Sequence, residues 1–443
     1  MLQVKVALTS GRTENLSLPE SSKVGDLKLL AQGFLGRRFF KLVTEDGQVL
    51  GEELTLQADG VQDGGQLSAI VQQAKLAATS RAFALWCYGG SSIVTWGSPD
   101  YGADTSAVQD KLKNVQQIQA TEGAFAARLG DGSVITWGSS FSGGDSSAVQ
   151  DQLENVQQVE SSDYAFAAIL SDGSVVTWGD PDFGGDSSAV QEQLKTVRQV
   201  KATAFAFAAI MEDGSLVTWG DPKDGGDCSS VQDQLRSVQQ VEASWGAFAA
   251  ILADRSVVCW GNPKGGGDSS AVQDQLRSVQ QICFGGLAFA AIRSDGSVVT
   301  WGDPEHGGNS SQVQDQLRNV KQIQGNLGAF AAILEDGSVI TWGKVGSGGY
   351  CGAVRGQLKD VREIHATERA FAAILGEGSM VTWGKADCGG DSSSVEDRFR
   401  NVQQIQATDS AFAALLADDS VLTWGRSDSG GDSSAVKDQL AFV

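Results

Sequence analysis

A tryptophan recurs every 41 residues along most of the chain, and this period constrains the fold more than any other feature. The nine members are Trp96, Trp137, Trp178, Trp219, Trp260, Trp301, Trp342, Trp383 and Trp424, each within a copy of the string A-F-A-A-(I/L)-L-x-D-G-S-V-V-T-W-G. Self-similarity at this spacing indicates one supersecondary unit copied in tandem, with each copy burying its apolar face against its neighbours. Function is therefore expected where the copies differ.

Each repeat contains three runs with the composition of β-strands, as residues 112–153 illustrate. The runs are residues 115–120, 124–129 and 133–137, which are rich in β-branched and aromatic side chains. An Asp-Gly pair at residues 131–132 joins the last two runs and is typical of a two-residue type I′ hairpin, whose turn needs positive φ. The sequence therefore predicts three antiparallel strands in every repeat.

Two repeats depart from this hairpin pattern. Arg255 and Asp419 stand where the other copies have glycine. Because positive φ costs a non-glycine residue about 1 kcal/mol, strain is expected at these two turns unless the turn type changes.

A glycine-rich segment and a short polar run follow the tryptophan of each repeat. Ser147 and Gln150 have the spacing of a capping box, and Val149 and Leu153 share one helical face. These residues predict a short helix on the outer edge of the repeat. The alternative is an anion site at the paired glycines, although Asp145 stands where the anion would bind.

The chain is acidic, with a formal net charge of −21 over 443 residues. A surface of this sign repels phosphate backbones, and no basic stripe offsets it, so a nucleic-acid partner is not expected. The sequence begins without the basic and apolar pattern of a leader peptide, and it has no apolar run of about 18 residues. We therefore expect no membrane partner and a location in the cytoplasm or the nucleus.

Residue types that carry catalysis or bind metals are few and scattered. The cysteines occupy different phases of the repeat, never at C-x-x-C spacing, and are expected to be reduced and isolated thiols. They are Cys87, Cys228, Cys259, Cys283, Cys351 and Cys388. His306 and His365 lie at different repeat positions, without a Cys or Ser partner at a recurring position. The sequence predicts a protein that is not an enzyme and has no cofactor and no metal site.

Residues 1–73 have a different pattern from the repeats. Leu2, Val4 and Val6 alternate with polar residues as in a half-buried strand. The expected order is strand 2–8, a turn at Ser10 and Gly11, strand 15–18, helix 21–30, a strand from Phe39 to residue 43, a hairpin turn at 45–47 and strand 63–71. This β-β-α-β-β order predicts a β-grasp domain.

That order, with the opening Met-Leu-Gln-Val-Lys-Val, resembles ubiquitin-like domains over residues 1–73. The di-glycine tail of ubiquitin has no counterpart, because the chain continues through Gln72 and Gln73. The resemblance places ubiquitin's hydrophobic recognition patch at Leu8, Val43 and Ala69. The alternative interpretation is that the domain caps the exposed face of the first repeat, since terminal repeats need caps.

Four motifs recur in the repeats: V-x-x-I-x-A, A-F-A-A-I-L, D-G-S-V-V-T-W-G and a glycine-rich turn. They resemble the repeats of the regulator of chromosome condensation and, in their shortness, the three-stranded blades of beta-lactamase inhibitory protein II. The resemblance implies a mainly β chain, with a ubiquitin-like domain at residues 1–73 and a β-propeller-like array of nine 41-residue repeats at residues 71–443. Val71 is expected to open the first strand of the first repeat. An open superhelical β-repeat array is the alternative architecture.

Strand direction places two variable loops of each repeat on one face of the array. Seven large apolar residues of these loops fall in adjacent repeats and are candidate partner-binding residues: Phe141, Tyr164, Phe183, Phe205, Trp245, Phe284 and Leu287. Aromatic anchors on the loops of a rigid scaffold are typical of protein interfaces. The alternative is that each ring fills space within its own blade.

The sequence therefore predicts a non-enzymatic scaffold that binds a protein partner through these loops, the partner being basic or a component of the ubiquitin pathway. One alternative is an adaptor or regulator in ubiquitin signalling, with the ubiquitin-like domain as its docking module. Another is a guanine-nucleotide exchange factor, which rests on fold analogy alone.

Overall fold

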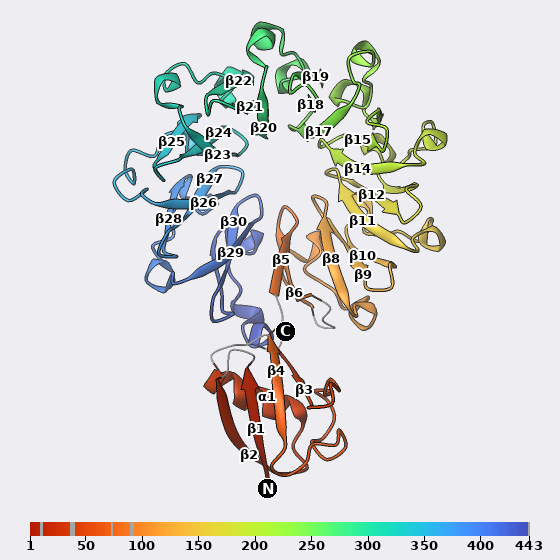
Figure 1. Cartoon of the computed structure of the whole chain (residues 1–443), viewed down its shortest axis with the longest axis vertical. Helices are drawn as coiled ribbons and strands as arrows, with labels where there is room; N and C mark the ends of the chain where they lie inside the picture. Colours follow the sequence, from red (N-terminus) through yellow and green to blue (C-terminus); the bar gives the residue numbers. More distant parts are fainter. Residues whose placement is uncertain (9–11, 36–39, 72–73, 89–92, 442–443) are drawn as a thin grey trace.

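The computed structural model describes residues 1–8, 12–35, 40–71, 74–88 and 93–441. Within these residues the chain forms one mixed four-stranded sheet followed by nine three-stranded antiparallel sheets (Figure 1). The expected turn at Ser10 and Gly11, the expected strand start at Phe39, and Gln72 and Gln73 lie outside the described residues.

The N-terminal sheet and its helix form a separate unit, which we call the head (residues 1–71). Its elements are β1 (Leu2–Leu8), β2 (Thr13–Leu18), α1 (Val24–Leu35), β3 (Phe40–Val43) and β4 (Gln66–Val71), in the sheet order β2-β1-β4-β3, with β1 and β4 parallel. Val4 and Val6 share one face of β1 and belong to the same buried core as Leu27 and Ala31 of α1. The β-β-α-β-β order is the one expected from the sequence, although α1 begins and ends later than the expected helix.

The ubiquitin resemblance placed a recognition patch on residues that are buried here. Leu8, Val43 and Ala69 are buried, and Leu8 and Ala69 belong to the core of the head. Successive residues of a strand point to opposite faces, and Ile70, the neighbour of Ala69, is the exposed one. The patch assignment is therefore wrong for these three residues, and the ubiquitin-like nature of the head stays a prediction.

Val71 belongs to the head and not to the first repeat, in contrast to the expectation. It pairs with Phe40 in the head sheet. The first repeat strand begins at Ala74, which pairs with Cys87.

Nine units, numbered here in chain order, make up the described part of the array. Their sheets are β5-β6-β7 (Ala74–Ala78, Ala82–Cys87, Ile93–Gly97), β8-β9-β10 (Val115–Ala120, Ala124–Leu129, Val134–Gly138), β11-β12-β13 (Val156–Ser161, Ala165–Leu170, Val175–Gly179), β14-β15-β16 (Val197–Ala202, Ala206–Met211, Leu216–Gly220), β17-β18-β19 (Val238–Ala243, Ala247–Leu252, Val257–Gly261), β20-β21-β22 (Val279–Phe284, Ala288–Arg293, Val298–Gly302), β23-β24-β25 (Val320–Gly325, Ala329–Leu334, Val339–Gly343), β26-β27-β28 (Val361–Ala366, Ala370–Leu375, Met380–Gly384) and β29-β30-β31 (Val402–Ala407, Ala411–Leu416, Val421–Gly425). A 3-10 turn follows each third strand: η1 (Pro99–Tyr101), η3 (Ser140–Ser142), η5 (Pro181–Phe183), η7 (Pro222–Asp224), η9 (Pro263–Gly265), η11 (Pro304–His306), η13 (Val345–Ser347), η14 (Ala386–Cys388) and η16 (Ser427–Ser429). The predicted three strands per repeat are confirmed.

The hairpin between the second and third strands is longer than predicted. Leu129 donates its N–H to the Ser133 carbonyl at 2.9 Å, and Gly132 donates to the Leu129 carbonyl at 3.1 Å. Gly132 has φ of 83° whereas Asp131 is not left-handed, so the loop is a three-residue type I turn with a bulge and not a two-residue type I′ turn. Arg255 and Asp419 keep left-handed φ values of 64° and 63°, the conformation for which strain is expected in a residue other than glycine.

The expected helix after the paired glycines is a single 3-10 turn, η4 (Gln150–Gln152). Ser146, and not Ser147, holds it by donating to Gln150 Oε1 at 2.9 Å, while Gln150 Nε2 donates to the Val134 carbonyl at 3.0 Å. Leu153 is buried in the core of the next sheet, so its apolar character serves packing between units. Other units have η2 (Gln109–Lys111), η6 (Gln191–Gln193), η8 (Ser229–Val231), η10 (Ser270–Gln275), η12 (Gln314–Gln316), η15 (Glu396–Arg398), η17 (Ser434–Val436) and η18 (Gln439–Ala441).

Neighbouring units are joined by the recurring tryptophan. Trp137 stacks on Phe125 of its own sheet, with ring centroids 5.2 Å apart, and its Nε1 donates to the Gly102 carbonyl of the preceding unit at 2.9 Å. Gly102 ends η1 with φ of 95°, and a Cβ there would lie 2.7 Å from the Phe125 ring. Glycine is therefore required at this position for its backbone conformation and for the close approach of the next unit.

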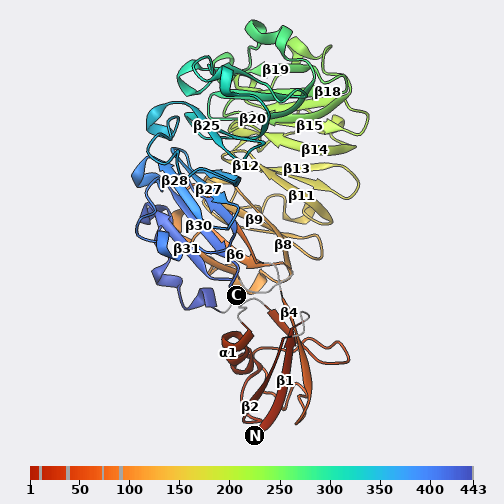
Figure 2. The ribbon, with the colours of Figure 1, turned by 60° about the vertical axis from the view of Figure 1, so that its left-hand side comes forward.

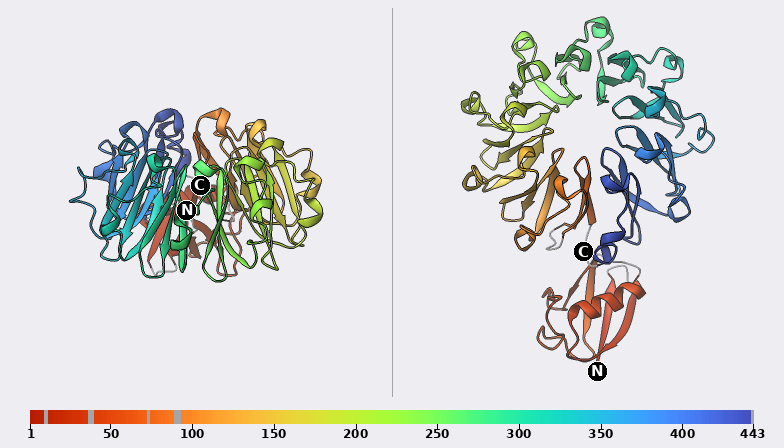
Figure 3. Two further views of the ribbon diagram at one scale, coloured as in Figure 1. Left: turned by 90° about the horizontal axis from the view of Figure 1, so that it is seen from above. Right: turned by 180° about the vertical axis from the view of Figure 1, so that it is seen from behind.

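The same contact joins the last unit to the first. Trp96 Nε1 donates to the Gly430 carbonyl at 3.1 Å, and a Cβ at Gly430 would lie 2.6 Å from the Phe83 ring. Leu440, near the C-terminal end, shares a buried core with Ala74 of β5. Figure 1 and Figure 3 show the sheets around one axis, and Figure 2 shows the head outside them, beside the C-terminus.

Candidate functional site

A three-residue loop connects the first and second strands of each unit, and its first residue fastens it to the 3-10 turn of the same unit. In unit four, Thr203 Oγ1 accepts a hydrogen bond from the Ala206 N–H at 2.9 Å and donates to the Asp224 carbonyl at 3.1 Å. Ser, Thr or Asn makes the second bond in eight units, and Gly285 takes this place in unit six. Both variable loops therefore lie on one face, as the sequence predicted.

The second residue of these loops forms a circle of backbone hydrogen bonds around the central channel. Glu122 donates its N–H to the Asp163 carbonyl at 2.8 Å, and Asp163 donates to Ala204 at 3.1 Å. The series of hydrogen bonds closes at Asp409, whose N–H donates to the Ser80 carbonyl at 3.0 Å. In chain order its members are Ser80, Glu122, Asp163, Ala204, Trp245, Gly286, Leu327, Glu368 and Asp409, and only Gly286 bonds one residue out of step, to Asn326.

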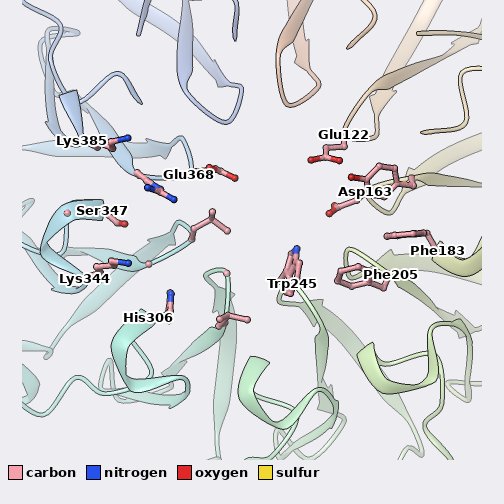
Figure 4. A pocket seen from close by; sticks show the side chains of 17 residues that line it. Glu122, Asp163, Phe183, Phe205, Trp245, His306, Lys344, Ser347, Glu368 and Lys385 are labelled. Carbon is pink, nitrogen blue, oxygen red and sulfur yellow. The ribbon is translucent and has the colours of Figure 1, made fainter. Parts of the chain in front are cut away.

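A cavity of about 820 Å³ opens inside this circle, on the loop face (Figure 4). A second cavity of about 540 Å³ continues along the channel. The two cavities share six lining residues, so they form the mouth and the interior of one opening: Glu122, Asp163, Trp245, Gly286, Leu327 and Glu368. A volume of this size is typical of ligand-binding sites.

Four aromatic rings in mutual contact form one side of the mouth, and we call them the aromatic wall. Tyr164 lies 4.5 Å from Phe183, Phe183 lies 5.2 Å from Phe205, and Phe205 lies 4.8 Å from Trp245, as distances between ring centroids. Trp245 keeps 47% of its surface exposed, and the other three rings are partly buried. Leu287 continues this apolar side of the cavity.

The structure separates the seven candidate residues into three groups. Tyr164, Phe183, Phe205, Trp245 and Leu287 line the mouth. Phe284 is half-exposed at the end of β20 and lines the channel interior. Phe141 is 82% exposed and lines neither cavity, because it is the middle residue of η3 whereas Phe183 is the last residue of η5.

The other side of the opening, from the mouth into the channel interior, carries carboxylates that were not among the predicted site residues. Glu122, Asp163, Glu368 and Asp409, here called the acidic arc, occupy the same loop position in units two, three, eight and nine. These units are neighbours through unit one, because the last unit contacts the first. Their spacing carried the signal, since positions 122, 163, 368 and 409 differ by multiples of the 41-residue period, whereas the predicted interface comprised apolar residues alone.

Burial, together with repulsion between carboxylates, raises the pKa values of Asp163, Glu368 and Asp409. Burial, then the charges of Glu368, Glu122 and Asp163, raise the pKa of Asp409 to about 7, although Arg81 opposes this. Burial and the charge of Glu122 raise the pKa of Asp163 to about 6. These carboxyls therefore titrate near neutral pH.

Tyr164 connects the acidic arc to the aromatic wall. A hydrogen bond to the Glu122 carboxylate, followed by burial, raises the pKa of the Tyr164 hydroxyl. The phenol thus stays protonated and donates to the carboxylate.

Basic side chains lie farther out on the same face. Lys385 lies 3.1 Å from Asp387 and is paired with it. Lys344 and Arg369 are exposed and line the cavity. His306 also lines it, with Nδ1 at 3.3 Å from Asp303 Oδ1.

Other kinds of site are missing from the part of the chain that the structure describes. No group of three or more His, Cys, Asp or Glu residues there has the arrangement of a metal site. No helix among the described residues has the length and apolar character needed to cross a membrane. The six cysteines are free thiols and all are buried.

No family model matches the chain, and no curated protein matches its sequence. Among solved structures, Prp20p of Saccharomyces cerevisiae, the yeast RCC1, was studied with its binding to Gsp1p and histones; it is 14% identical, with 62% of this chain and 83% of that chain covered and a TM-score of 0.38. The CRINKLY WD40 ectodomain of the Arabidopsis thaliana receptor kinase ACR4 is 17% identical, covers 60% and 93%, and has a TM-score of 0.35. The computationally designed protein Ika8 is 14% identical, covers 80% and 96%, and has a TM-score of 0.32. Similarities at this level assign no function.

Proposed function

We propose that this protein is a non-enzymatic interaction scaffold, built as a closed nine-bladed β-propeller, that binds a protein partner at the mouth of its central channel. The aromatic wall carries the proposal. Tyr164, Phe183, Phe205 and Trp245 come from three consecutive units and still form one continuous surface. Clustered aromatic anchors that line a pocket are what binding hot spots consist of.

The rigidity of the loops supports this role. Phe205 lies between Thr203, whose hydroxyl bonds to the Asp224 carbonyl and to the Phe205 and Ala206 N–H groups, and Ala206, which begins β15. The middle residues of the loops are held by the circle of backbone hydrogen bonds. Anchors that are already ordered lose little conformational freedom on binding.

The closed ring rests on contacts between the ends of the array. The bond from Trp96 to Gly430 and the bond from Asp409 to Ser80 repeat, between units nine and one, the contacts found elsewhere in the array. A closed ring has no terminal unit that exposes an unpacked face.

A pair of variants tests the proposed function. Phe205→Ala combined with Trp245→Ala removes two anchors that are partly or half exposed, so the melting temperature should change little while partner capture is lost. Phe141→Ala is the matched control, since it removes an exposed aromatic ring of the same face outside the cavity. The readout is affinity purification from a cell extract, with mass spectrometry of the captured proteins.

The expected result is a set of proteins captured by the wild type and by Phe141→Ala but not by the double variant. The opposite result, a large loss of thermal stability in the double variant with unchanged capture, would show that the two rings fill space within the fold. The ubiquitin-signalling alternative has less support, because the residues assigned to its docking patch are buried.

A further inference from the structure

The mouth of the channel is divided into an acidic half and an apolar half. The acidic arc covers units eight, nine, two and three, and the aromatic wall with Leu287 and Leu327 covers units three to seven. Figure 4 shows Glu122 and Asp163 on one side of the opening and Glu368 on the other, with Phe183, Phe205 and Trp245 following Asp163. One occupant of the opening would therefore contact carboxylates and aromatic rings together.

A buried hydroxyl in the middle of the acidic arc lacks a partner. Ser80 is the loop residue between Asp409 and Glu122 in the circle and lines the channel cavity. It is 6% exposed, and its Oγ makes no hydrogen bond with any of the described residues. Buried polar atoms are normally paired, so an unpaired one beside an open cavity indicates a ligand group at this position.

Building on the proposed function, we propose that the mouth recognises a basic peptide segment of the partner, whose Lys or Arg side chain enters between the acidic arc and the aromatic wall. The cationic group is stabilised by the carboxylates of Glu122, Glu368 and Asp409, and one of its N–H groups donates a hydrogen bond to Ser80 Oγ. The apolar stem and the flanking residues of the peptide pack on the rings, whose faces also attract a cation.

The basic residues that line the mouth are consistent with a peptide cation bound in the acidic half. Lys385 is neutralised by Asp387 at 3.1 Å, so it adds little positive charge at the mouth. Lys344 and Arg369 are exposed on the apolar side and beyond Glu368, where they repel a second cation and leave the acidic half as the favoured place for the first. The partner segment thus presents one basic side chain to the channel and not a run of them.

The test uses the full chain and three synthetic peptides with blocked ends. The peptides have the sequence Gly-Ser-Leu-X-Leu-Ser-Gly, in which X is Arg, Gln or Glu. Binding is measured by calorimetry and by the emission of Trp245, which is 47% exposed while the other ten tryptophans are at most 4% exposed. The Arg peptide should bind about tenfold more tightly than the Gln peptide, because a desolvated charge pair is worth at least that factor.

Charge removal inside and outside the cavity completes the test. Glu122→Gln with Asp409→Asn should weaken the Arg peptide by about tenfold and leave the Gln peptide unchanged. Asp182→Asn with Glu305→Gln is the control, because it removes two exposed carboxylates of the same face that line neither cavity.

Three outcomes overturn the inference. They are equal binding of the Arg and Gln peptides, a preference for the Glu peptide, and no binding of the Arg peptide at all. Partner capture that still depends on Phe205 and Trp245 would leave the proposed function standing in each case. The inference is supported if the preference for the Arg peptide disappears in Glu122→Gln with Asp409→Asn and persists in Asp182→Asn with Glu305→Gln.

Discussion

At the residue scale, Arg255 holds a backbone conformation that glycine holds at the equivalent position of neighbouring repeats. Its φ is 64°, whereas Gly296 has φ of 73°. Replacing Arg255 by glycine should raise the free energy of unfolding by about 1 kcal/mol, because the left-handed conformation costs glycine nothing. Urea denaturation of the purified chain measures this change.

The reverse substitution provides the control. A Cβ at Gly296 would lie 2.9 Å from Asn319 Cα, so Gly296→Ala adds a steric clash to the backbone strain. It should destabilise the chain by more than Arg255→Gly stabilises it. Unchanged stability of Arg255→Gly would mean that the positive φ is not strained in this turn.

Asp409 makes the stability of the chain depend on pH. Its pKa is raised on folding to about 7 by burial and by Glu368, Glu122 and Asp163, against the effect of Arg81. Because the folded state binds this proton more tightly than the unfolded state, the stabilising contribution is present in acid and is lost as pH rises from about 4 to about 7.

The expected result is a lower urea midpoint at about pH 8 than at about pH 5, and a smaller difference between the two in Asp409→Asn, which cannot ionise. Comparing the variant with the wild type at both pH values isolates Asp409 from other groups that titrate in this window, such as His365. A difference of the same size in both proteins would contradict the assigned pKa.

At the element scale, the loop that carries Phe205 is held by one hydroxyl. Thr203 Oγ1 bonds to the Ala206 N–H and to the Asp224 carbonyl. Thr203→Val keeps the shape but leaves the buried Ala206 N–H and the partly buried Asp224 carbonyl without the hydroxyl, so it should cost about 1–3 kcal/mol and also weaken partner capture by displacing Phe205. Chemical denaturation and the capture assay measure the two effects.

Thr203→Ser is the matched control for this loop, since other units use serine at the same place. It should retain both hydrogen bonds and most of the stability. Loss of stability in Thr203→Val with full partner capture would show that the position of Phe205 does not depend on the hydroxyl.

The strands of each unit could be predicted because their signals are local. β-Branched and aromatic residues marked all three strands, and the Asp-Gly pair marked the hairpin. The prediction of a short helix was wrong because Ser146 and Gln150 fasten the segment to β10. Residue spacing alone does not show this contact with another strand. The glycines that end the 3-10 turns are required because a Phe ring of the next unit packs against them. This requirement could not be predicted from one repeat either.

The candidate site was predicted only in part, because some of its residues have a local signal in the sequence and others depend on contacts between units. Tyr164, Phe183, Phe205 and Trp245 were found because aromatic residues on loops are conspicuous in a sequence. Phe141 was grouped with them although it is one position out of phase in its turn. The acidic arc requires unit nine to lie beside unit one, and this adjacency comes from contacts between the two ends of the array and not from any single repeat.

At the scale of the whole molecule, the contact between the first and last units decides whether the array behaves as a ring. Trp96 is 4% exposed and bonds to Gly430 in unit nine, whereas Trp260 is 3% exposed and bonds to Gly225 in the preceding unit. In a closed ring these two environments are equivalent. In an open stack, the indole of Trp96 would face solvent.

Trp96→Ala and Trp260→Ala should therefore cost the same, about 3–5 kcal/mol each, because each removes a buried aromatic side chain between two units. Both variants should unfold in one cooperative transition, since every unit of a ring is held from two sides. Urea melts followed by tryptophan emission and by circular dichroism measure the cost and the cooperativity together. A neutral Trp96→Ala, or the separate loss of terminal units at low urea, is the behaviour of an open array that unfolds piecemeal and would contradict the closed ring.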